Sequence, residues 1–146
     1  VYVPDEKFLQ DFSYLSISTK GQKKKLARYI LRKLEEDASN TPIDEDGFSI
    51  EHILPESPGA NWFENFTDVQ IEEFIYRLGN LTLLKPALNR QIGNETYSLK
   101  LNTYQRSVYT LTKNILAEQW TANTIAARQE KLSQRAVSIW RADFVS

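Results

Sequence analysis

The sequence has 146 residues, the length of a single domain, since domains most often comprise about 100–150 residues. Hydrophobic residues make up 41% and charged residues 25%, a globular composition that excludes disorder along the whole length and fibrous repeats. There is no Cys and only 1 His, which excludes disulfides, thiolate metal sites, cysteine nucleophiles and sites built on two imidazoles. A formal net charge of −1 does not by itself indicate a nucleic-acid-binding protein.

The chain begins with Val and contains no Met, so we expect it to be a piece of a longer protein that forms a single domain over residues 1–146. No stretch approaches the roughly 18 consecutive apolar residues of a membrane span, and no signal-peptide pattern is present. We therefore expect no membrane partner and a cytoplasmic location.

Two helices are predicted at the start of the chain. Apolar residues at helical spacing place the first over residues 4–15, and Ser18 or Thr19 is predicted to cap the second, which runs to about Asp37. The three lysines at 23–25 then fall in the first two turns of that helix. A solvated face is the favoured interpretation of this run, and contact with phosphate is the alternative.

A small strand-containing centre is predicted next, followed by helices to the end. Its elements are a strand over Phe48–Leu54, a short helix at about Val69–Arg77, a strand over Leu81–Leu84, and a short helix from Pro86 to Ile92 that ends at Gly93. The remainder is predicted to be helical, with one apolar stripe from Tyr97 through Val108 to Ile115 and a last helix capped by Thr121 or Asn123. The stripe and the three Trp are interpreted as core.

Three segments carry the chemistry: residues 51–55 (EHILP), 77–84 (RLGNLTLL) and 88–94 (LNRQIGN). In this order they resemble the HNH (His-Me finger) nucleases and, more closely, the C-terminal nuclease domain of GmrSD-type modification-dependent restriction endonucleases. Seven later positions also fit that pattern: Tyr97, Lys100, Tyr104, Ser107, Trp120, Ile125 and Arg128. The resemblance covers about Phe48 to Trp140.

The resemblance implies an α+β, mostly helical fold with a small ββα-metal core. That core would span residues 46–95, between N-terminal helices in 1–40 and C-terminal helices in 96–146. The implied function is that of a metal-dependent DNA endonuclease that nicks DNA, within a restriction or anti-phage defence protein. The implied partner is an N-terminal or separate nucleotide-hydrolysing domain that senses modified DNA.

Phosphodiester hydrolysis requires an activated water and a cation that stabilises charge on the phosphate. His52 is the one candidate general base, because an imidazole titrates near pH 7. Mg²⁺ is the expected ion and Mn²⁺ the alternative, since hard cations take oxygen ligands. By resemblance, Asn89 and Glu51 are the metal ligands, with Glu51 the less certain of the two. Asn80, by the same resemblance, orients the base and braces the hairpin.

Arg90 and Lys100 are candidates for gripping phosphate, with a solvated surface role as the alternative. Asn94 is grouped with them as DNA-binding, while metal binding and helix capping stay open for it. Two rival functions also stay open: an RNA-cleaving toxin with the same centre, and a non-catalytic helical module that binds DNA or a partner. Residues 85–146 carry 9 basic and 4 acidic residues, so the sequence places the attraction for phosphate in this C-terminal part.

Overall fold

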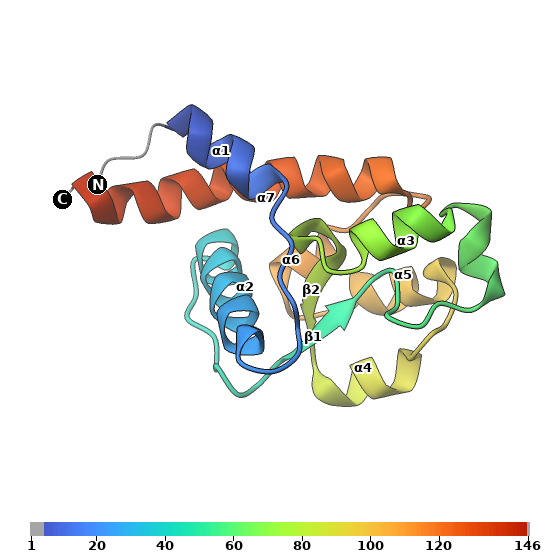
Figure 1. Cartoon of the computed structure of the whole chain (residues 1–146). Coiled ribbons are helices and arrows are strands. Elements are labelled where there is room, and N and C mark those ends of the chain that lie inside the picture. The colour runs from blue at the N-terminus through green and yellow to red at the C-terminus, as the bar shows by residue number, and fades with distance from the viewer. Residues whose placement is uncertain (1–4, 146) are drawn as a thin grey trace.

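The structure is a computed structural model that describes residues 5–145, with side chains through Trp140. Helices dominate, and a two-stranded sheet lies among them (Figure 1). In chain order the elements are α1 (Asp5–Ser13), α2 (Lys23–Ser39), β1 (Ser49–His52), the 3₁₀ helix η1 (Ala60–Glu64), α3 (Asp68–Phe74), the 3₁₀ helix η2 (Leu78–Asn80), β2 (Leu81–Leu84), α4 (Pro86–Ile92), α5 (Tyr97–Gln105), α6 (Thr110–Lys113) and α7 (Ala122–Val145). The predicted α+β, mostly helical class is confirmed.

The two strands pair antiparallel, with Ser49 opposite Leu84 and His52 opposite Leu81. β1 is shorter than the predicted strand, because beyond His52 the backbone bonds to the Asn80 side chain and not to a strand. Its Oδ1 accepts a hydrogen bond of 2.8 Å from the backbone N–H of Leu54, which replaces a partner on a strand. The catalytic candidate His52 is therefore the last residue of β1.

The start of α2 differs from the prediction. The helix begins at Lys23, after Gln22, which makes no side-chain capping hydrogen bond. Gly21, at φ +63°, turns the chain just before it. Neither Ser18 nor Thr19 caps the helix, since Thr19 is buried and its hydroxyl contacts His52 instead. Sequence capping rules could not show this contact, because it joins residues 33 positions apart.

The apolar stripe from Tyr97 to Ile115 does not form one helix. α5 ends at Gln105, and Val108, predicted to be core, is 66% exposed. The buried carboxylate of Glu35 accepts hydrogen bonds from the backbone N–H groups of Thr110 and Leu111, at 2.8 and 2.9 Å. This side chain from α2 caps a new helix, α6, and so splits the predicted one.

Several other predicted boundaries agree with the structure, but the short helix predicted to reach Arg77 ends at Phe74. Pro86 opens α4, and Gly93, at φ +41°, ends it. Thr121 and Thr124 exchange hydrogen bonds at the start of α7, so Thr121 rather than Asn123 is the cap. The predicted first helix loses its last two residues, and its predicted start at residue 4 lies outside the described residues.

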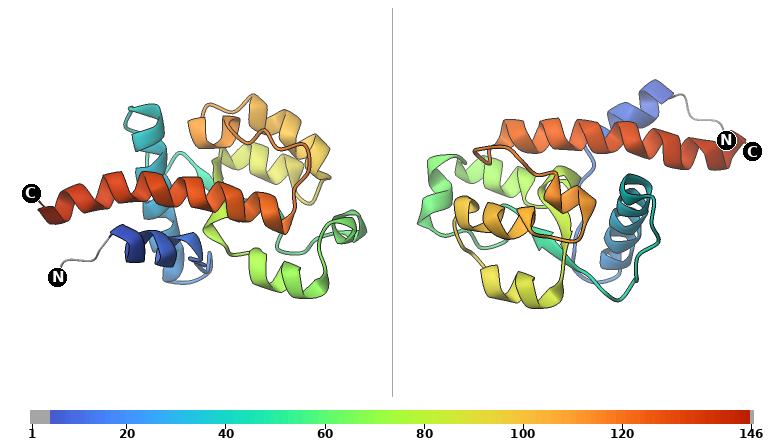
Figure 2. Two further views of the ribbon diagram at one scale, coloured as in Figure 1. Left: turned by 90° about the horizontal axis from the view of Figure 1, so that it is seen from above. Right: turned by 180° about the vertical axis from the view of Figure 1, so that it is seen from behind.

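Two hydrophobic cores meet at the hairpin. One gathers residues of α2, α6 and α7 with Leu81 and Leu83 of β2, while α1 packs against it; Figure 2 shows α1 running alongside α7. The other lies beneath η1, α3, α4 and α5 and includes Leu84. Trp62 and Trp120 are buried in this second core, and Trp140 packs against the first. The interpretation of the three Trp as core is confirmed.

Candidate active site

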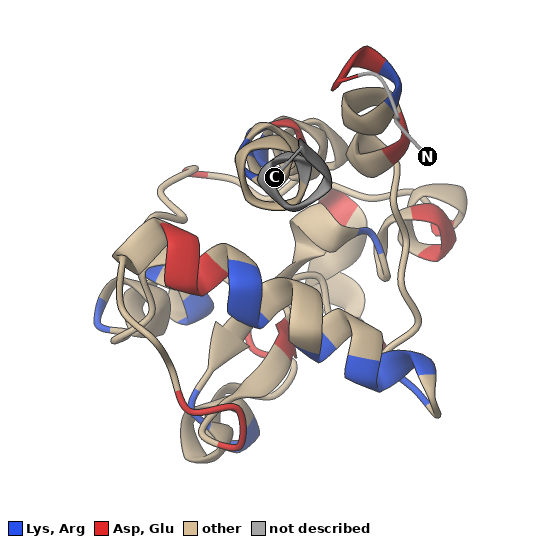
Figure 3. Ribbon diagram, turned by 90° about the vertical axis from the view of Figure 1, so that its left-hand side faces the viewer, with Lys and Arg blue, Asp and Glu red and all other residues tan. Residues whose placement is uncertain are grey.

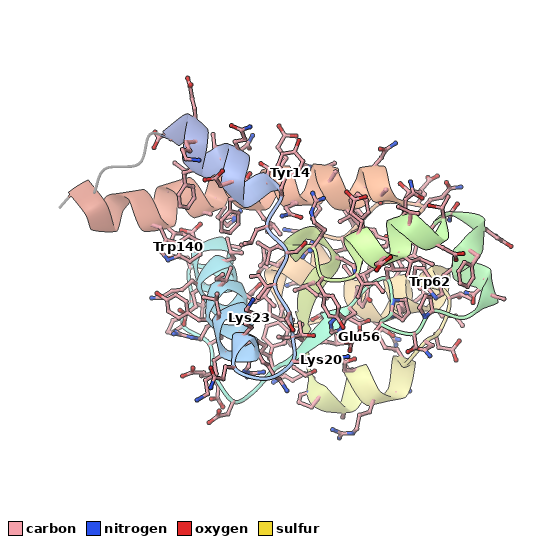
Figure 4. All side chains as sticks on the ribbon, viewed as in Figure 1. Tyr14, Lys20, Lys23, Glu56, Trp62 and Trp140 are labelled. Atoms are coloured by element: carbon pink, nitrogen blue, oxygen red, sulfur yellow. The ribbon has the colours of Figure 1, made fainter. Side chains whose placement is uncertain are left out.

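His52 lines a polar pocket of about 280 Å³ beside β1. The pocket collects side chains from the loop before α2, from α2 itself, from β1, from the turn after β1 and from α4. Its lining residues are Thr19, Lys24, Arg28, Ser49, Ile50, His52, Glu56 and Asn89. Figure 4 labels Glu56 near β1, with Lys20 and Lys23 toward the adjacent end of α2. Of the predicted site residues, the pocket brings together His52 and Asn89.

The His52 side chain is 13% exposed, and its two ring nitrogens face different neighbours. Nε2 lies 3.0 Å from the Thr19 hydroxyl, and Nδ1 lies 3.8 Å from a carboxylate oxygen of Glu56. Burial lowers the pKa of His52 below its ordinary value; the Glu56 carboxylate opposes this shift, and nearby lysines add to it. This shift favours the neutral imidazole, the state that a general base requires.

Glu56 was not among the predicted site residues. Its carboxylate accepts a hydrogen bond of 2.6 Å from the Tyr76 hydroxyl and lies 3.8 Å from Lys20 Nζ. The bond to Glu56 raises the pKa of Tyr76 to about 12, so the phenol stays protonated and keeps donating. A carboxylate beside Nδ1 favours a proton on that nitrogen and leaves the Nε2 lone pair of His52 free to act. The available sequence signal was the spacing of four residues from His52.

The Asn89 amide is held in one orientation. Its Nδ2 donates hydrogen bonds of 2.9 Å to the carbonyl oxygen of Ile50 and to the Ser49 hydroxyl. A carbonyl oxygen can only accept, so the nitrogen faces β1. Asn89 Oδ1 accepts no hydrogen bond from the described part of the chain. The amide thus offers the pocket an oxygen, as the prediction of a metal ligand requires.

Asn80 is fully buried, and each of its hydrogen bonds joins two segments. Oδ1 accepts from the backbone of Leu54 and, at 2.9 Å, from the Trp120 indole, while Nδ2 donates to the carbonyl oxygens of Leu54 and Ile75. The side chain touches neither His52 nor the pocket. It braces the chain just past the base, and in this position it acts on the geometry rather than on the reaction.

Glu51 lies apart from the pocket. Successive side chains of a strand point to opposite faces, so the neighbour of His52 faces the interior. Its carboxylate is 3.1 Å from Lys100 Nζ and accepts a hydrogen bond from the Tyr104 hydroxyl. Burial raises the pKa of Glu51, against the opposing effects of Lys100 and Tyr104. The metal-ligand role of Glu51 stays a prediction, and in this arrangement its carboxylate already has two partners.

The three predicted phosphate-binding residues lie in different surroundings. Lys100 is fully buried, and besides Glu51 its ammonium group donates to the carbonyl oxygens of His52 and Ile53. Arg90 and Asn94 are exposed, on and just after α4, but neither lines the His52 pocket. Lys100 therefore positions the end of β1 from inside, where a DNA phosphate does not reach.

The pocket fits a hard cation better than a soft one. Residues 5–145 contain no group of three or more His, Cys, Asp and Glu that could hold a metal ion. The pocket supplies separate oxygen donors, chiefly Asn89 Oδ1 and the Glu56 carboxylate. Mg²⁺ accepts such a site, because it keeps several waters and binds few protein oxygens.

Comparison with known proteins identifies the family. A model of the C-terminal domain of GmrSD restriction endonucleases matches residues 2–135, a range that contains every predicted site residue. A search of curated proteins finds no match. Across the described residues, each helix is too short or too polar to cross a membrane. The chain belongs to the family of C-terminal domains of GmrSD restriction endonucleases, which makes it a nuclease domain that acts on DNA.

Proposed function

We propose that the chain is a metal-dependent endonuclease domain that nicks DNA, with His52 as the general base. One observation carries the proposal: the imidazole of His52 and the oriented amide of Asn89 line the same polar pocket. An activated water and an oxygen-ligated cation are the two requirements of metal-assisted phosphodiester hydrolysis. The pocket supplies a residue for each.

The residues of the chain divide the work. His52 takes a proton from the attacking water at Nε2, where the Thr19 hydroxyl lies 3.0 Å away, so this hydroxyl turns aside or relays the proton. The Glu56 carboxylate, 3.8 Å from Nδ1, favours a proton on that nitrogen and stabilises the imidazolium that forms. Asn80 holds the backbone at Leu54, and Lys100 holds the carbonyl oxygen of His52 itself. Together they keep the imidazole ring in place.

Asn89 Oδ1 is the proposed protein ligand of the ion, with Mg²⁺ expected and Mn²⁺ as the alternative. A divalent ion bound there would stabilise negative charge on the phosphate and on the leaving oxygen. Removal of divalent ions with a chelator should abolish nicking.

The modification that is sensed and the module that senses it belong to the proposal as well. The resemblance to modification-dependent restriction endonucleases supports a substrate of modified DNA and a nucleotide-hydrolysing partner domain. A role in defence against foreign DNA follows from the same resemblance. A site that hydrolyses a phosphodiester engages the sugar-phosphate backbone of DNA and not its bases. We therefore expect base modification to be sensed elsewhere.

Supercoiled plasmid incubated with Mg²⁺ or Mn²⁺ tests the proposal. We expect the wild type to produce open circles, and both His52→Ala and Asn89→Ala to reduce the rate by at least about 100-fold, the scale of a lost general base. Asn102→Ala is the matched control, because Asn102 is exposed on α5, away from the pocket, and should cut normally. Nicking that persists in His52→Ala would contradict the proposed role of His52 as general base. Plasmid with and without modified bases, and an RNA arm, identify the substrate.

A further inference from the structure

Two cations of α2 line the His52 pocket without a carboxylate partner. The Lys24 side chain is exposed and makes no ion pair or hydrogen bond with the described residues. The Arg28 guanidinium donates a hydrogen bond of 2.7 Å to the carbonyl oxygen of Phe48 and another to that of Glu45. Its central carbon lies 4.2 Å from the centre of the Phe48 ring. These groups carry no negative charge, and Arg28 forms no ion pair with the described residues, so neither cation has a carboxylate partner there.

The pocket is cationic as a whole. Glu56 is its acidic lining residue, and this carboxylate already has Lys20 Nζ at 3.8 Å. Lys24 and Arg28 are four residues apart on α2, so they lie one above the other on the same face of the helix. Figure 3 shows Lys and Arg gathered over the first turns of α2 and the loop before it, while Asp and Glu lie at the other end of the helix.

Several cations of the C-terminal part are already engaged. Arg128 donates to the carbonyl oxygens of Gly79 and Leu81, and burial lowers its pKa to about 10. Arg135 forms an ion pair of 2.8 Å with Asp37. Lys100 is buried against Glu51. Lys24 and Arg28 of α2, by contrast, line the same pocket as the candidate base.

We propose that Lys24 and Arg28 form a phosphate-binding wall that holds the backbone of the strand to be cut against His52. The inference rests on the proposed function for its meaning, but it makes a claim about binding alone. A phosphate in this pocket, which His52 and Asn89 also line, receives charge-assisted hydrogen bonds from both cations. The wall thus performs the task that the sequence assigned to Arg90 and Lys100.

Direct binding to labelled duplex DNA tests the wall without catalysis. Fluorescence anisotropy without divalent ions, at several salt concentrations, should show that Lys24→Gln weakens binding roughly tenfold at about 50 mM salt and reduces the slope of log K against log[salt] by about 0.9. Lys33→Gln is the matched control, because it removes the same charge from the same helix but lies about two and a half turns from Lys24, on the opposite face. Equal affinity and slope for Lys24→Gln and the wild type would overturn the inference, as would a wild type that does not bind.

Arg28 is tested with a pair of variants, since it also holds the segment before β1. Arg28→Gln should lose affinity, and Arg28→Lys, which keeps the charge, should regain most of it; equal binding by both variants and the wild type contradicts a role for Arg28. Urea unfolding of each variant separates lost binding from lost folding. If His52→Ala still nicks while Lys24→Gln binds poorly, the proposed mechanism fails and the wall stands. If His52→Ala is inactive while Lys24→Gln binds normally, the wall fails and the mechanism stands.

Discussion

The single imidazole of the chain has an asymmetric environment. A hydroxyl from Thr19 faces one ring nitrogen, and a carboxylate from Glu56 faces the other. The carboxylate raises the pKa of His52, while burial lowers it more. Because the two effects oppose each other, the pKa of His52 depends on the Glu56 carboxylate as well as on burial.

His52 should titrate below the ordinary imidazole pKa of about 6.5. In Glu56→Gln the pKa should fall further, because the negative charge that favours the imidazolium is gone. The acid limb of the nicking rate then moves to lower pH, since the base must be neutral to act. NMR titration measures this directly, because one His produces one set of imidazole signals.

Glu72→Gln serves as the control for that titration, since Glu72 is exposed on α3 and far from the ring along the chain. It should leave the His52 pKa unchanged. An unchanged pKa in Glu56→Gln, or a wild-type pKa above the ordinary value, would contradict the assigned environment.

Lys100 and Glu51 form a buried pair, with side chains 0% and 4% exposed. Lys100→Met leaves the carboxylate buried without its cation and should lower the free energy of unfolding by about 3–5 kcal/mol. Adding Glu51→Gln should recover a large part of the loss, because the amide needs no counter-charge. Urea denaturation of the two single variants and the double variant measures the coupling. Additive losses would show that the pair does not interact.

At the scale of elements, α7 is joined to the start of the hairpin by hydrogen bonds from a buried side chain. Gln129 of α7 accepts hydrogen bonds from Arg77 and from the backbone of Gly79, and donates to the carbonyl oxygens of Phe12 and Leu15. One buried amide therefore ties α7, the segment around η2 and the end of α1 together. Asn80, at the end of η2, lies next to this junction and bonds the chain just past His52.

Gly79 is where α7 and η2 approach most closely. A Cβ at this position would overlap the carbonyl oxygen of Ile125 and lie 2.9 Å from Gln129 Cβ. Gly79→Ala should therefore push α7 away and lower the free energy of unfolding by about 1–3 kcal/mol. Gly59→Ala is the control, because its added Cβ would meet only the end of the Asn61 side chain. Thermal unfolding of both variants checks the difference, and equal melting temperatures would contradict the close approach.

At the scale of the whole molecule, the hairpin sits where two hydrophobic cores meet, and the pocket opens between α2 and α4. The pocket contains the single His of the chain, so one molecule carries one such base. The proposed site would cut one strand of a duplex in each encounter.

A time course with supercoiled plasmid should therefore show open circles accumulating before any linear DNA appears. Linear DNA requires a second, independent cut on the opposite strand nearby, so it should rise with the square of enzyme concentration at early times. Gel densitometry at several enzyme concentrations measures both products. Linear DNA that appears from the start, in proportion to enzyme, would point instead to a paired arrangement of two sites.

The motifs around residues 52, 80 and 89 carried the family assignment, and the periodicity placed both strands and the short helix after them. The predicted C-terminal stripe failed at Val108, because a carboxylate from α2 starts a new helix there. Of the residues predicted for the site, His52 and Asn89 share a pocket, while Glu51 turns inward beside Lys100. No sequence motif marked Thr19 or Glu56 as a site residue. Only the packing of the folded chain brings their side chains to the imidazole.

Charge shows most clearly what the sequence by itself determined and what only the tertiary structure decided. The residue types and spacing of the three motifs determined the family and the candidate base, because this chemistry requires particular side chains in a particular order. A sum of charges along the chain placed the cations for DNA in residues 85–146. The fold engages Lys100, Arg128 and Arg135 in contacts with other parts of the chain and places Lys24 and Arg28 in the same pocket as His52. Charge sums follow chain order, whereas a phosphate responds to which side chains reach one pocket with their charge unpaired.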